Sequence, residues 1–486
     1  MPSSLKFLIL RQIFHGDLPV SPRHVPLLVS LSLCAAASLG QNQPLESDVI
    51  ATVGPHTVSV RDVLDRIELM PWPGKDRPAL RDSIAWRATV SLIAEKLLAL
   101  KATSLGIGLD QENAARFASL ERALARDQLY REEVSARVTI SREEAGPAMK
   151  RFATELRLAV FPAKDEKDAR SMARILTAGR PLPFAPAVTE TVSVSFGELA
   201  QSHEDVAYAL KRRFEARPSY SVSSGWLVLQ LLDRRSNPES ENLSVADRGI
   251  AAARLLRKRK QSALAASYVD RYGAGIPTHM DSLLFRAIAD TLRGTMSRDA
   301  EGHRKGKAFG VNEGDVIRLW EVFRNDRGRS FITHGRDTVT VGDMINGMAF
   351  HPVQVRSLGR GVFLEDLNRG IITVAESELI SSRAMKLGYN AREDVRRDLA
   401  AWVEAWQTQA LAGRVGGDSL NAYIARLASE YGVWIDRAKI RELKFSPVNL
   451  VTRRMIGFGG SLPAVPILPE MWGWYHVWLE SKRIAP

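Results

Sequence analysis

The chain has little of what many enzyme classes need. Its 486 residues contain one cysteine, Cys34, which excludes an intramolecular disulfide, a cysteine-rich zinc site and an iron–sulfur cluster. Aromatic residues make up only 7% of the chain, although ten of them are tryptophan. No apolar run approaches the roughly 20 residues that a membrane-spanning helix needs. No Gly-x-Ser-x-Gly, P-loop or dinucleotide fingerprint occurs, so neither a serine hydrolase of that type nor a nucleotide-binding enzyme is predicted.

Candidate metal ligands and catalytic acids are equally sparse. The nine histidines are scattered, and none has a partner at ligand spacing. We therefore predict no metal site and no cofactor. Paired acids such as Glu143-Glu144 and Asp165-Glu166 lie in charged runs, which are typical of solvated helix faces. The sequence assigns no catalytic residue.

What is present is ordinary for a globular protein with a basic surplus. Hydrophobic residues are 45% and charged residues 25% of the chain, and the net charge is +12. The densest basic runs are Arg254–Lys260 and His303–Lys307. No nucleic-acid recognition motif accompanies them, so no nucleic-acid partner is predicted. They are interpreted as solvated helix faces, with attraction to acidic unfolded chains or peripheral association with an anionic membrane as the functional alternative.

The first forty residues have the pattern of an export signal. Arg23-His24 precede the apolar stretch Val25–Leu33, and small residues and then Gln41-Asn42 follow. This order predicts a signal over residues 1–40 and a periplasmic location; a buried helix is the alternative. Cys34 vaguely resembles the acylated cysteine of a bacterial lipoprotein box, although the preceding Leu33 is large for that pattern. A lipid tether at Cys34 is therefore a second possibility.

An internal repeat is the most informative feature. Residues 54–62, Gly-Pro-His-Thr-Val-Ser-Val-Arg-Asp, recur at 335–343 as Gly-Arg-Asp-Thr-Val-Thr-Val-Gly-Asp, an offset of 281. Each copy predicts a β segment, a turn and a helix start. Ser59 and Thr340 stand three residues before Asp62 and Asp343, which is the spacing of a helix capping box.

Two further matches extend the repeat and indicate an insertion. Leu105-Gly106 corresponds to Leu387-Gly388 at offset 282, and Tyr272–Ile276 corresponds to Tyr431–Ile435 at offset 159. Because the offset falls between these matches, the first copy carries extra residues. We predict a domain inserted at a loop tip of a helical module.

The inserted stretch alternates strand and helix patterns. Strands are predicted over 156–161, 192–196 and 225–232, and helices over 166–177 and 203–214. The predicted fold class is therefore mainly α, with a small α+β domain inserted in an N-terminal helical module and a second helical module C-terminal to it. The predicted domains are an export signal at 1–40, the first module at 41–150 with its helical return at 237–290, the inserted domain at 151–236, a linker at 291–330, the second module at 331–446 and a Trp/Pro-rich tail at 447–486.

The sequence resembles the SurA/PrsA-type periplasmic foldases. The pattern from Val53-Gly54 through Leu105-Gly106 is similar to their chaperone module. His203–Lys211 is similar to the parvulin (PpiC-type) helix that usually reads Phe-Glu-Asp-Ala-Ala-Phe-Ala-Leu, and Ser221–Leu231 is similar to the last parvulin strand. The resemblance implies a helical chaperone interrupted by a parvulin-like peptidyl-prolyl cis-trans isomerase, or rotamase, domain.

The residues of the implied pocket depart from the family pattern. The resemblance places Leu199 at the usual pocket methionine and His203 at the usual pocket phenylalanine. Tyr208, Trp226 and Leu227 complete the candidate substrate pocket, and Leu227 replaces a histidine of the last strand. The first strand, 156–161, also lacks the family's histidine. The resemblance therefore implies a degenerate domain, weak or inactive as an isomerase.

The C-terminal tail leaves two interpretations open. Residues 462–478 contain three tryptophans and three prolines. They either complete the core of the second module or form an exposed site for a client or partner.

Together these patterns predict a periplasmic protein-folding chaperone that binds unfolded or nascent envelope polypeptides. One alternative is an active isomerase with a rearranged pocket. Another is a structural scaffold of an envelope complex, tethered through Cys34 or the tail. The sequence does not set the oligomeric state.

Overall fold

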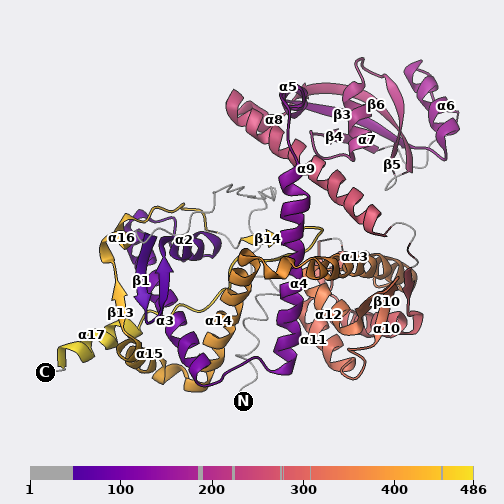
Figure 1. Cartoon of the computed structure of the whole chain (residues 1–486). Helices are drawn as coiled ribbons and strands as arrows, with labels where there is room; N and C mark the ends of the chain where they lie inside the picture. The colour runs from indigo at the N-terminus through magenta and orange to yellow at the C-terminus, as the bar shows by residue number, and fades with distance from the viewer. Residues whose placement is uncertain are drawn as a thin grey trace. The chain divides into compact units, whose positions relative to one another are not determined.

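The protein is mainly helical and consists of two compact units. The computed structural model describes residues 48–183, 190–221, 225–273, 276, 278–306, 308–449 and 452–484. Unit 1 takes its residues from both ends of the chain, up to Leu129 and again after 274, and unit 2 is Tyr130–Ala274. Small sheets accompany the helices (Figure 1). The predicted fold class, mainly α with a small α+β region, is confirmed.

Unit 2 contains one antiparallel four-stranded sheet. Its strands, in the order β4-β3-β6-β5, are Glu190–Val194, Thr154–Pro162, Gly225–Ser236 and Ala216–Ser221. The helices are α5 (Arg142–Phe152), α6 (Glu166–Thr177), α7 (Gln201–Ala209), α8 (Pro238–Glu241) and α9 (Val245–Gly273), after a 3₁₀ turn at Ser135–Arg137. The predicted helix 166–177 and the three predicted strands are therefore present in unit 2.

Two details of unit 2 differ from the sequence prediction. The helix predicted over 203–214 ends at Ala209, because the chain turns sharply and Phe214 takes a left-handed backbone conformation with φ 68°. Glu215 holds this turn by accepting hydrogen bonds from the backbone N–H groups of Lys211 and Arg212. Strand β5 was not predicted, because its proline and serines hide the apolar alternation of a strand.

Unit 1 begins with a hairpin and three helices and continues after unit 2. Its first part is β1 (Val49–Val53), β2 (His56–Ser59), α2 (Val60–Leu69), a 3₁₀ turn at Pro78–Leu80, α3 (Arg81–Ser104) and α4 (Gln111–Glu133), which runs into unit 2. Its second part starts with β7 (Thr278–Met280), α10 (Ser282–Arg298), β8 (Arg304–Lys305), β9 (Ala308–Gly310) and α11 (Glu313–Val322). The hairpin β10 (Ser330–His334) and β11 (Asp337–Thr340) follows, then α12 (Val341–Phe350), β12 (Gln354–Val355) and α13 (Arg360–Lys386).

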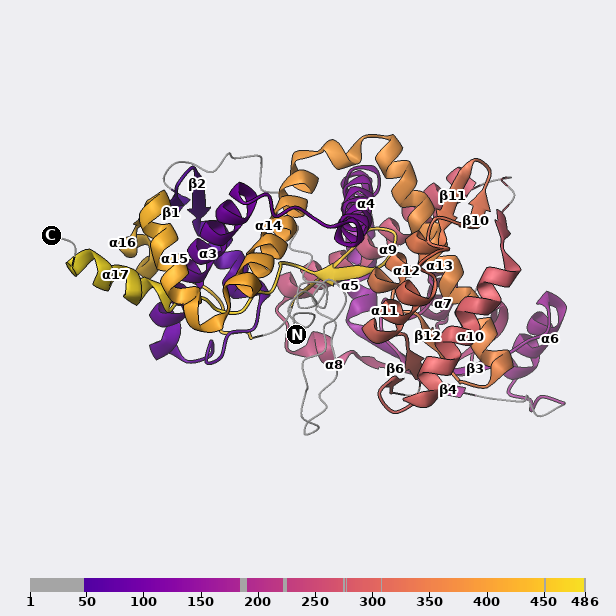
Figure 2. The same ribbon diagram turned by 90° about the horizontal axis from the view of Figure 1, so that it is seen from below.

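The remaining elements of unit 1 come from the C-terminal part of the chain. They are a 3₁₀ turn at Tyr389–Ala391, α14 (Glu393–Val415), α15 (Gly417–Tyr431), β13 (Val433–Ile435), α16 (Arg437–Glu442), β14 (Arg453–Met455), β15 (Ser461–Pro463) and α17 (Trp474–Ile484). Figure 2 shows α14 and α15 lying with α3 at the end of the unit that carries β1 and β2.

The two copies of the repeat have the same local structure. The elements β1-β2-α2 and β10-β11-α12 have identical lengths and align at an offset of 281 residues. Each hairpin also has a bulge at its start. The turn glycines Gly54 and Gly335 have φ values of +53° and +61°, where a side chain would be strained. Both predicted capping boxes, Ser59 with Asp62 and Thr340 with Asp343, are confirmed.

A third strand closes each hairpin, but it comes from the other copy. β13 pairs with β1, and β7 pairs with β10, in the same register. Asp436 and Asp281 directly follow these strands and cap α16 and α10. The corresponding residues are therefore 155 apart. The sequence match at offset 159 was wrong by four residues, because the short Tyr-Gly-x-x-Ile pattern does not mark the strand itself.

This pairing brings the two ends of the chain into one hydrophobic core. α3 packs against α14, α15 and α16, and the core runs from Ile50 to Trp478. The order of the repeats along the chain therefore differs from the order in which their strands pair. The domain boundaries given by the sequence remain predictions.

The structure supports the interpretation of the C-terminal tail as part of the core. Trp474, Tyr475 and Trp478 are buried in the core of unit 1, and the Nε1 atoms of Trp474 and Trp478 donate to Val90 O (3.2 Å) and Ser429 Oγ (3.1 Å). Trp472 is the exception, with 40% of its surface exposed.

Candidate functional site

The predicted pocket residues of unit 2 lie on both faces of its sheet. Leu199, Tyr208 and Leu227 pack partly buried in one cluster with the core residues under α7. Trp226 belongs to the cluster under α6 on the other face, where its ring lies 5.2 Å from that of Tyr220. Because neighbouring strand residues point to opposite faces, Trp226 and Leu227 do not line one pocket.

His203 lies on the α7 face in a polar pair that the sequence did not indicate. Its Nδ1 atom is 2.6 Å from Ser219 Oγ, and both side chains are buried. Ser219 pairs with Leu227 across β5 and β6, so Leu227 lies next to this pair. Burial lowers the pKa of His203, which favours the neutral imidazole at neutral pH. Ser219 was missed because β5 was not recognised as a strand.

Tyr208 holds the other end of this face. Its hydroxyl donates to Thr154 O at 2.8 Å. Thr154 begins β3, whereas Leu227 pairs with Pro162 at the end of that strand. Burial raises the pKa of Tyr208, with Glu204 adding to the effect. The structure therefore brings Leu199, Tyr208 and Leu227 into one cluster but places the Tyr208 hydroxyl far along the strand from Leu227.

Chemically, the α7 face offers an apolar surface with one neutral imidazole–hydroxyl pair. Such a surface can hold a proline ring by apolar contact. Because His203 and Ser219 are both less than 5% exposed, they are not placed to act as an accessible base and nucleophile. The assignment of Leu199, His203, Tyr208, Trp226 and Leu227 to a substrate pocket remains a prediction.

Unit 1 contains a larger open cavity, which we call the β12 groove. It has a volume of about 410 Å³. Its walls are the C-terminal end of α12, β12, α13 and the β14–β15 hairpin. The lining residues are His351, Pro352, Val353, Gln354, Asp366, Arg369, Gly370, Thr373, Met455, Gly460 and Ser461. Gly370 lets Val353 approach α13 closely, because a Cβ at Gly370 would lie 2.6 Å from Val353 Cγ1. No sequence pattern indicates this groove, because its walls are distant from one another in the chain.

The β12 groove has apolar walls and a fixed charge at one side. Met455 is 62% exposed there, and Pro352 is also exposed. Asp366 is buried and accepts hydrogen bonds from Arg356 N (2.8 Å) and Arg356 Nε (3.0 Å). The Arg356 side-chain hydrogen bond lowers the pKa of Asp366 against the effect of desolvation. Its charge is thus satisfied, and exposed Arg369, also in the lining, pairs with Glu365 at 2.9 Å.

Strand edges lie beside the groove. β12 is the edge strand of the sheet β12-β9-β8, and β14 and β15 form a two-stranded sheet. Edge strands present backbone groups to which an extended peptide can add.

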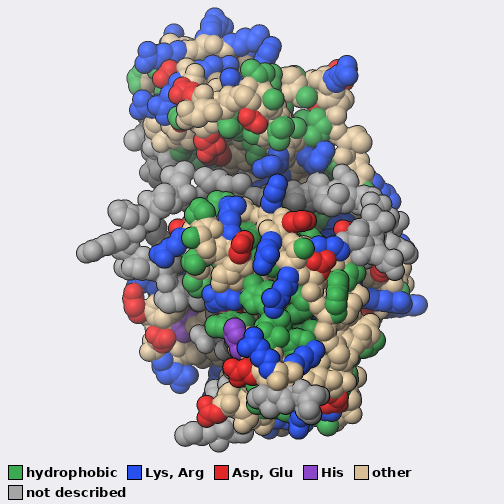
Figure 3. Space-filling model, turned by 90° about the vertical axis from the view of Figure 1, so that its left-hand side faces the viewer, with side chains coloured by type: hydrophobic (Ala, Val, Ile, Leu, Met, Phe, Trp, Pro, Cys, Tyr) green, Lys and Arg blue, Asp and Glu red, His purple; other side chains and the backbone are tan. Residues whose placement is uncertain are grey.

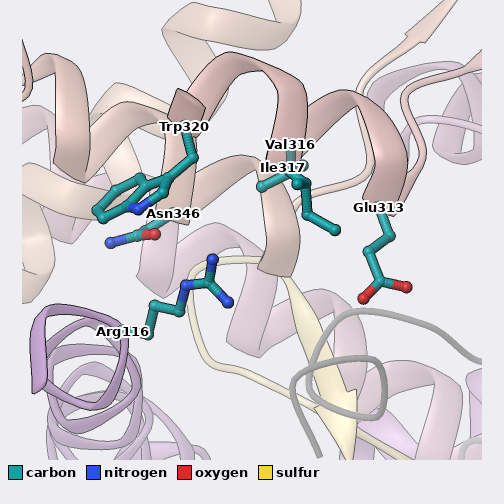
Figure 4. A pocket seen from close by; sticks show the side chains of 6 residues that line it. All are labelled: Arg116, Glu313, Val316, Ile317, Trp320 and Asn346. Atoms are coloured by element: carbon teal, nitrogen blue, oxygen red, sulfur yellow. The ribbon is translucent and has the colours of Figure 1, made fainter. Parts of the chain in front are cut away.

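A second cavity, shown in Figure 4, is much smaller. It lies between α4, α11 and α12, and Arg116, Glu313, Val316, Ile317, Trp320 and Asn346 line it. Its volume of about 10 Å³ is close to that of a single water site. The Trp320 Nε1 atom is buried there without an acceptor among the described residues. One water would supply that acceptor, so this cavity is structural rather than a ligand site.

The described part of the chain has neither a metal-binding cluster nor a membrane-spanning helix. It contains no group of three or more His, Cys, Asp or Glu placed to hold a metal ion. No helix in that part is both long and apolar enough to cross a bilayer. Cys34 and the export signal lie outside the described residues, so lipidation and export remain predictions.

Comparisons with known proteins add a structural likeness. No protein family model and no curated protein matches the chain. Among solved structures, it is similar to a peptidylprolyl isomerase, PrsA, from Bacillus cereus, at 16% identity over 46% of this chain and 93% of that one, with a TM-score of 0.18. A score this low defines neither the fold nor the function of this protein.

Proposed function

We propose that this protein is a periplasmic foldase-type chaperone that holds extended apolar segments of unfolded envelope polypeptides in the β12 groove. The observation that carries the proposal is the groove itself: an open, partly apolar cavity of about 410 Å³ beside strand edges. The sequence resemblance to the SurA/PrsA-type foldases supports the assignment to this class.

The chemistry of the groove suits a broad range of sequences. Exposed Pro352 and Met455 offer apolar contact, and methionine adapts its shape to different partners. A strand added to β12 or to the β14–β15 hairpin would bind through backbone hydrogen bonds, which depend little on side-chain identity. Arg369 would favour segments that carry an acidic residue.

Unit 2 is proposed to have weak isomerase activity or none. Prolyl isomerisation needs a tight apolar grip on the ring and stabilisation of a twisted amide across a barrier of roughly 18–20 kcal/mol. Leu199 and Leu227 can supply part of the grip. Buried His203 and Ser219 hydrogen-bond to each other and so offer less to a substrate amide.

Aggregation suppression tests the chaperone proposal. A urea-unfolded β-barrel membrane protein is diluted into buffer with the full-length chain, and light scattering is recorded. We expect wild-type protein to suppress aggregation. Met455→Glu and Thr373→Glu should weaken suppression about tenfold, because each places a charge against an apolar client.

Leu283→Glu is the matched control, since Leu283 is 74% exposed on α10 and does not line the groove. Equal suppression by all three variants and wild type would count against the groove, and absence of suppression by wild type would count against the chaperone.

A proline-peptide isomerisation assay addresses unit 2: a rate equal to that of an active parvulin would overturn the degenerate-site proposal and favour the active isomerase. Leu227→His, which restores the family's residue, is the informative variant there.

A further inference from the structure

The surface around α17 combines exposed aromatic rings with cations and is not used by the proposed chaperone site. We call this surface the α17 face. Its exposed apolar and aromatic residues are Trp472, His476 and Val477, and its cations are Arg87, Arg437 and Lys482. On the side of unit 1 that carries α16, α17 and β13, Figure 3 shows hydrophobic side chains gathered among Lys and Arg.

The inner half of α17 fixes the outer half in place. Trp474 and Trp478 are buried and hydrogen-bonded to the helices beneath. Their rings lie 6.0 Å apart, and Tyr475 lies 5.7 Å from each of them. The exposed rings are therefore held by a rigid support and do not fold back into the core.

The outer side of α17, together with Trp472 just before the helix, presents apolar surface to solvent. Trp472 is 40% exposed and Val477 37% exposed, and the His476 ring lies 6.0 Å from the Trp472 ring. On the neighbouring strand β13, Trp434 is 52% exposed. An exposed tryptophan has an apolar ring and a polar N–H, which suits the boundary between water and lipid.

Cations lie on the exposed Trp472 ring and on the more buried rings of Trp86 and Trp478, and Arg87 also pairs with Glu470. The Arg87 guanidinium lies 5.8 Å from the Trp472 ring centre, Arg437 lies 5.2 Å from the Trp86 ring, and Lys482 Nζ lies 4.0 Å from the Trp478 ring. Arg437 also donates to the Tyr475 hydroxyl at 2.6 Å. Cation–π contact keeps the positive groups beside the rings.

The exposed charges of α16, its C-terminal flank and the end of α17 are mostly basic. The basic residues there are Arg437, Arg441, Lys444, Lys482 and Arg483, and the exposed acidic residues are Glu442 and Glu480. A basic surface with projecting tryptophans complements an anionic lipid headgroup layer, which attracts each nearby Lys or Arg by about 1 kcal/mol. A protein partner would instead be expected to find a pocket for its own anchoring side chains.

We propose that the α17 face docks on anionic phospholipid membranes, with Trp472 and Val477 entering the headgroup layer and the basic residues contacting lipid phosphates. This binding is independent of client binding in the β12 groove. It would hold the protein reversibly at a membrane surface, without a membrane-spanning segment.

Vesicle co-sedimentation tests the proposal with the full-length chain. The probes are large vesicles of phosphatidylcholine alone and of phosphatidylcholine with about one third phosphatidylglycerol. We expect binding to the anionic vesicles that salt at about 0.5 M abolishes, and little binding to the neutral ones. Lys482→Gln with Arg483→Gln should weaken binding about tenfold or more. Trp472→Ala with Val477→Ser should weaken it by a similar factor.

The matched control is Leu283→Ser with Arg286→Gln, an exposed apolar and an exposed basic residue on α10. The control should bind as wild type does. Equal binding to neutral vesicles, no binding to either, or the same loss in the control would overturn the proposal. Sedimentation velocity tests whether the face instead binds a second copy of the chain. If the wild type is a dimer and the Trp472→Ala, Val477→Ser variant is not, the face is a dimer interface and the membrane proposal is overturned.

Discussion

At the scale of single residues, Arg126 shows how a buried charge can be accommodated. Its side chain is fully buried in unit 1. It donates to Gly457 O (3.1 Å), Ser377 O (2.8 Å), Ser381 Oγ (2.9 Å) and Gly459 O (3.0 Å). These bonds fasten the turn before β15 to α13. The fifth contact, between Arg126 Nη2 and His351 Nε2 at 3.2 Å, has a consequence for stability.

His351 should make stability depend on pH. Desolvation, with repulsion from Arg126 adding to it, lowers the pKa of His351 to about 3, whereas in the unfolded chain the pKa is about 6.5. Below pH 6.5 the unfolded chain therefore binds a proton that the folded protein does not. The stability that neutral His351 contributes is complete above pH 6.5 and is lost as the pH falls toward 3.

The measurement compares wild type with His351→Gln, which keeps an acceptor for Arg126 but does not titrate. Urea unfolding at pH 7.5 and at pH 5.5 gives the free energy of unfolding of each. The wild type should lose about 1.4 kcal/mol more than the variant over this interval. A difference that does not change with pH would show that His351 does not titrate in this way.

At the scale of elements, the repeat provides a matched pair of helix caps. Asp281 Oδ1 accepts from Leu283 N (2.9 Å) and Leu284 N (3.0 Å) at α10. Asp436 Oδ1 accepts from Ala438 N and Lys439 N, at 3.0 and 3.1 Å, at α16. Both follow a closing strand, so each cap fixes where a strand ends and a helix begins.

We expect Asp281→Ala and Asp436→Ala each to lower the free energy of unfolding by about 1 kcal/mol. Asp281→Asn and Asp436→Asn should cost much less, because asparagine is also a good N-cap. Urea unfolding followed by circular dichroism checks both pairs. If the asparagine and alanine variants lose equal stability, the aspartates act through charge rather than as caps.

At the scale of the whole molecule, the two ends of the chain build one core. The strand β13 and the tail pack on β1 and α3, so unit 1 cannot be completed until the C-terminal segment has been made. This gives the tail a structural role that is separable from the α17 face.

Trp474→Ala and Trp472→Ala separate these roles. Trp474 is fully buried, so its truncation should lower the free energy of unfolding by about 3–5 kcal/mol. Trp472 is 40% exposed, so its truncation should lower the free energy of unfolding by only about 1 kcal/mol. Thermal and urea unfolding measure both. A stable Trp474→Ala protein would mean that the tail is not part of the core.

Prediction succeeded where the signal was local in sequence. The capping boxes at Ser59 and Thr340, the helix 166–177 and the strand predicted over 156–161 depend on side chains a few residues apart, so composition and spacing were enough. The candidate pocket was harder. Leu199 and Leu227 do share a cluster, but Trp226 points to the other face, and Ser219 was missed because a proline hid its strand.

By itself, the sequence determined the repeated hairpin–helix units, their caps and the α+β pattern between them, because each depends on hydrogen bonds and periodicities that span only a few residues. Only the tertiary structure decided that β13 closes the first hairpin and β7 the second, that the tail enters the core, and that a groove opens beside β12. Those features depend on contacts between segments far apart in the chain, from Met280 with Ile332 to Val90 with Trp474, and the short patterns that mark each segment do not say which partner it packs against.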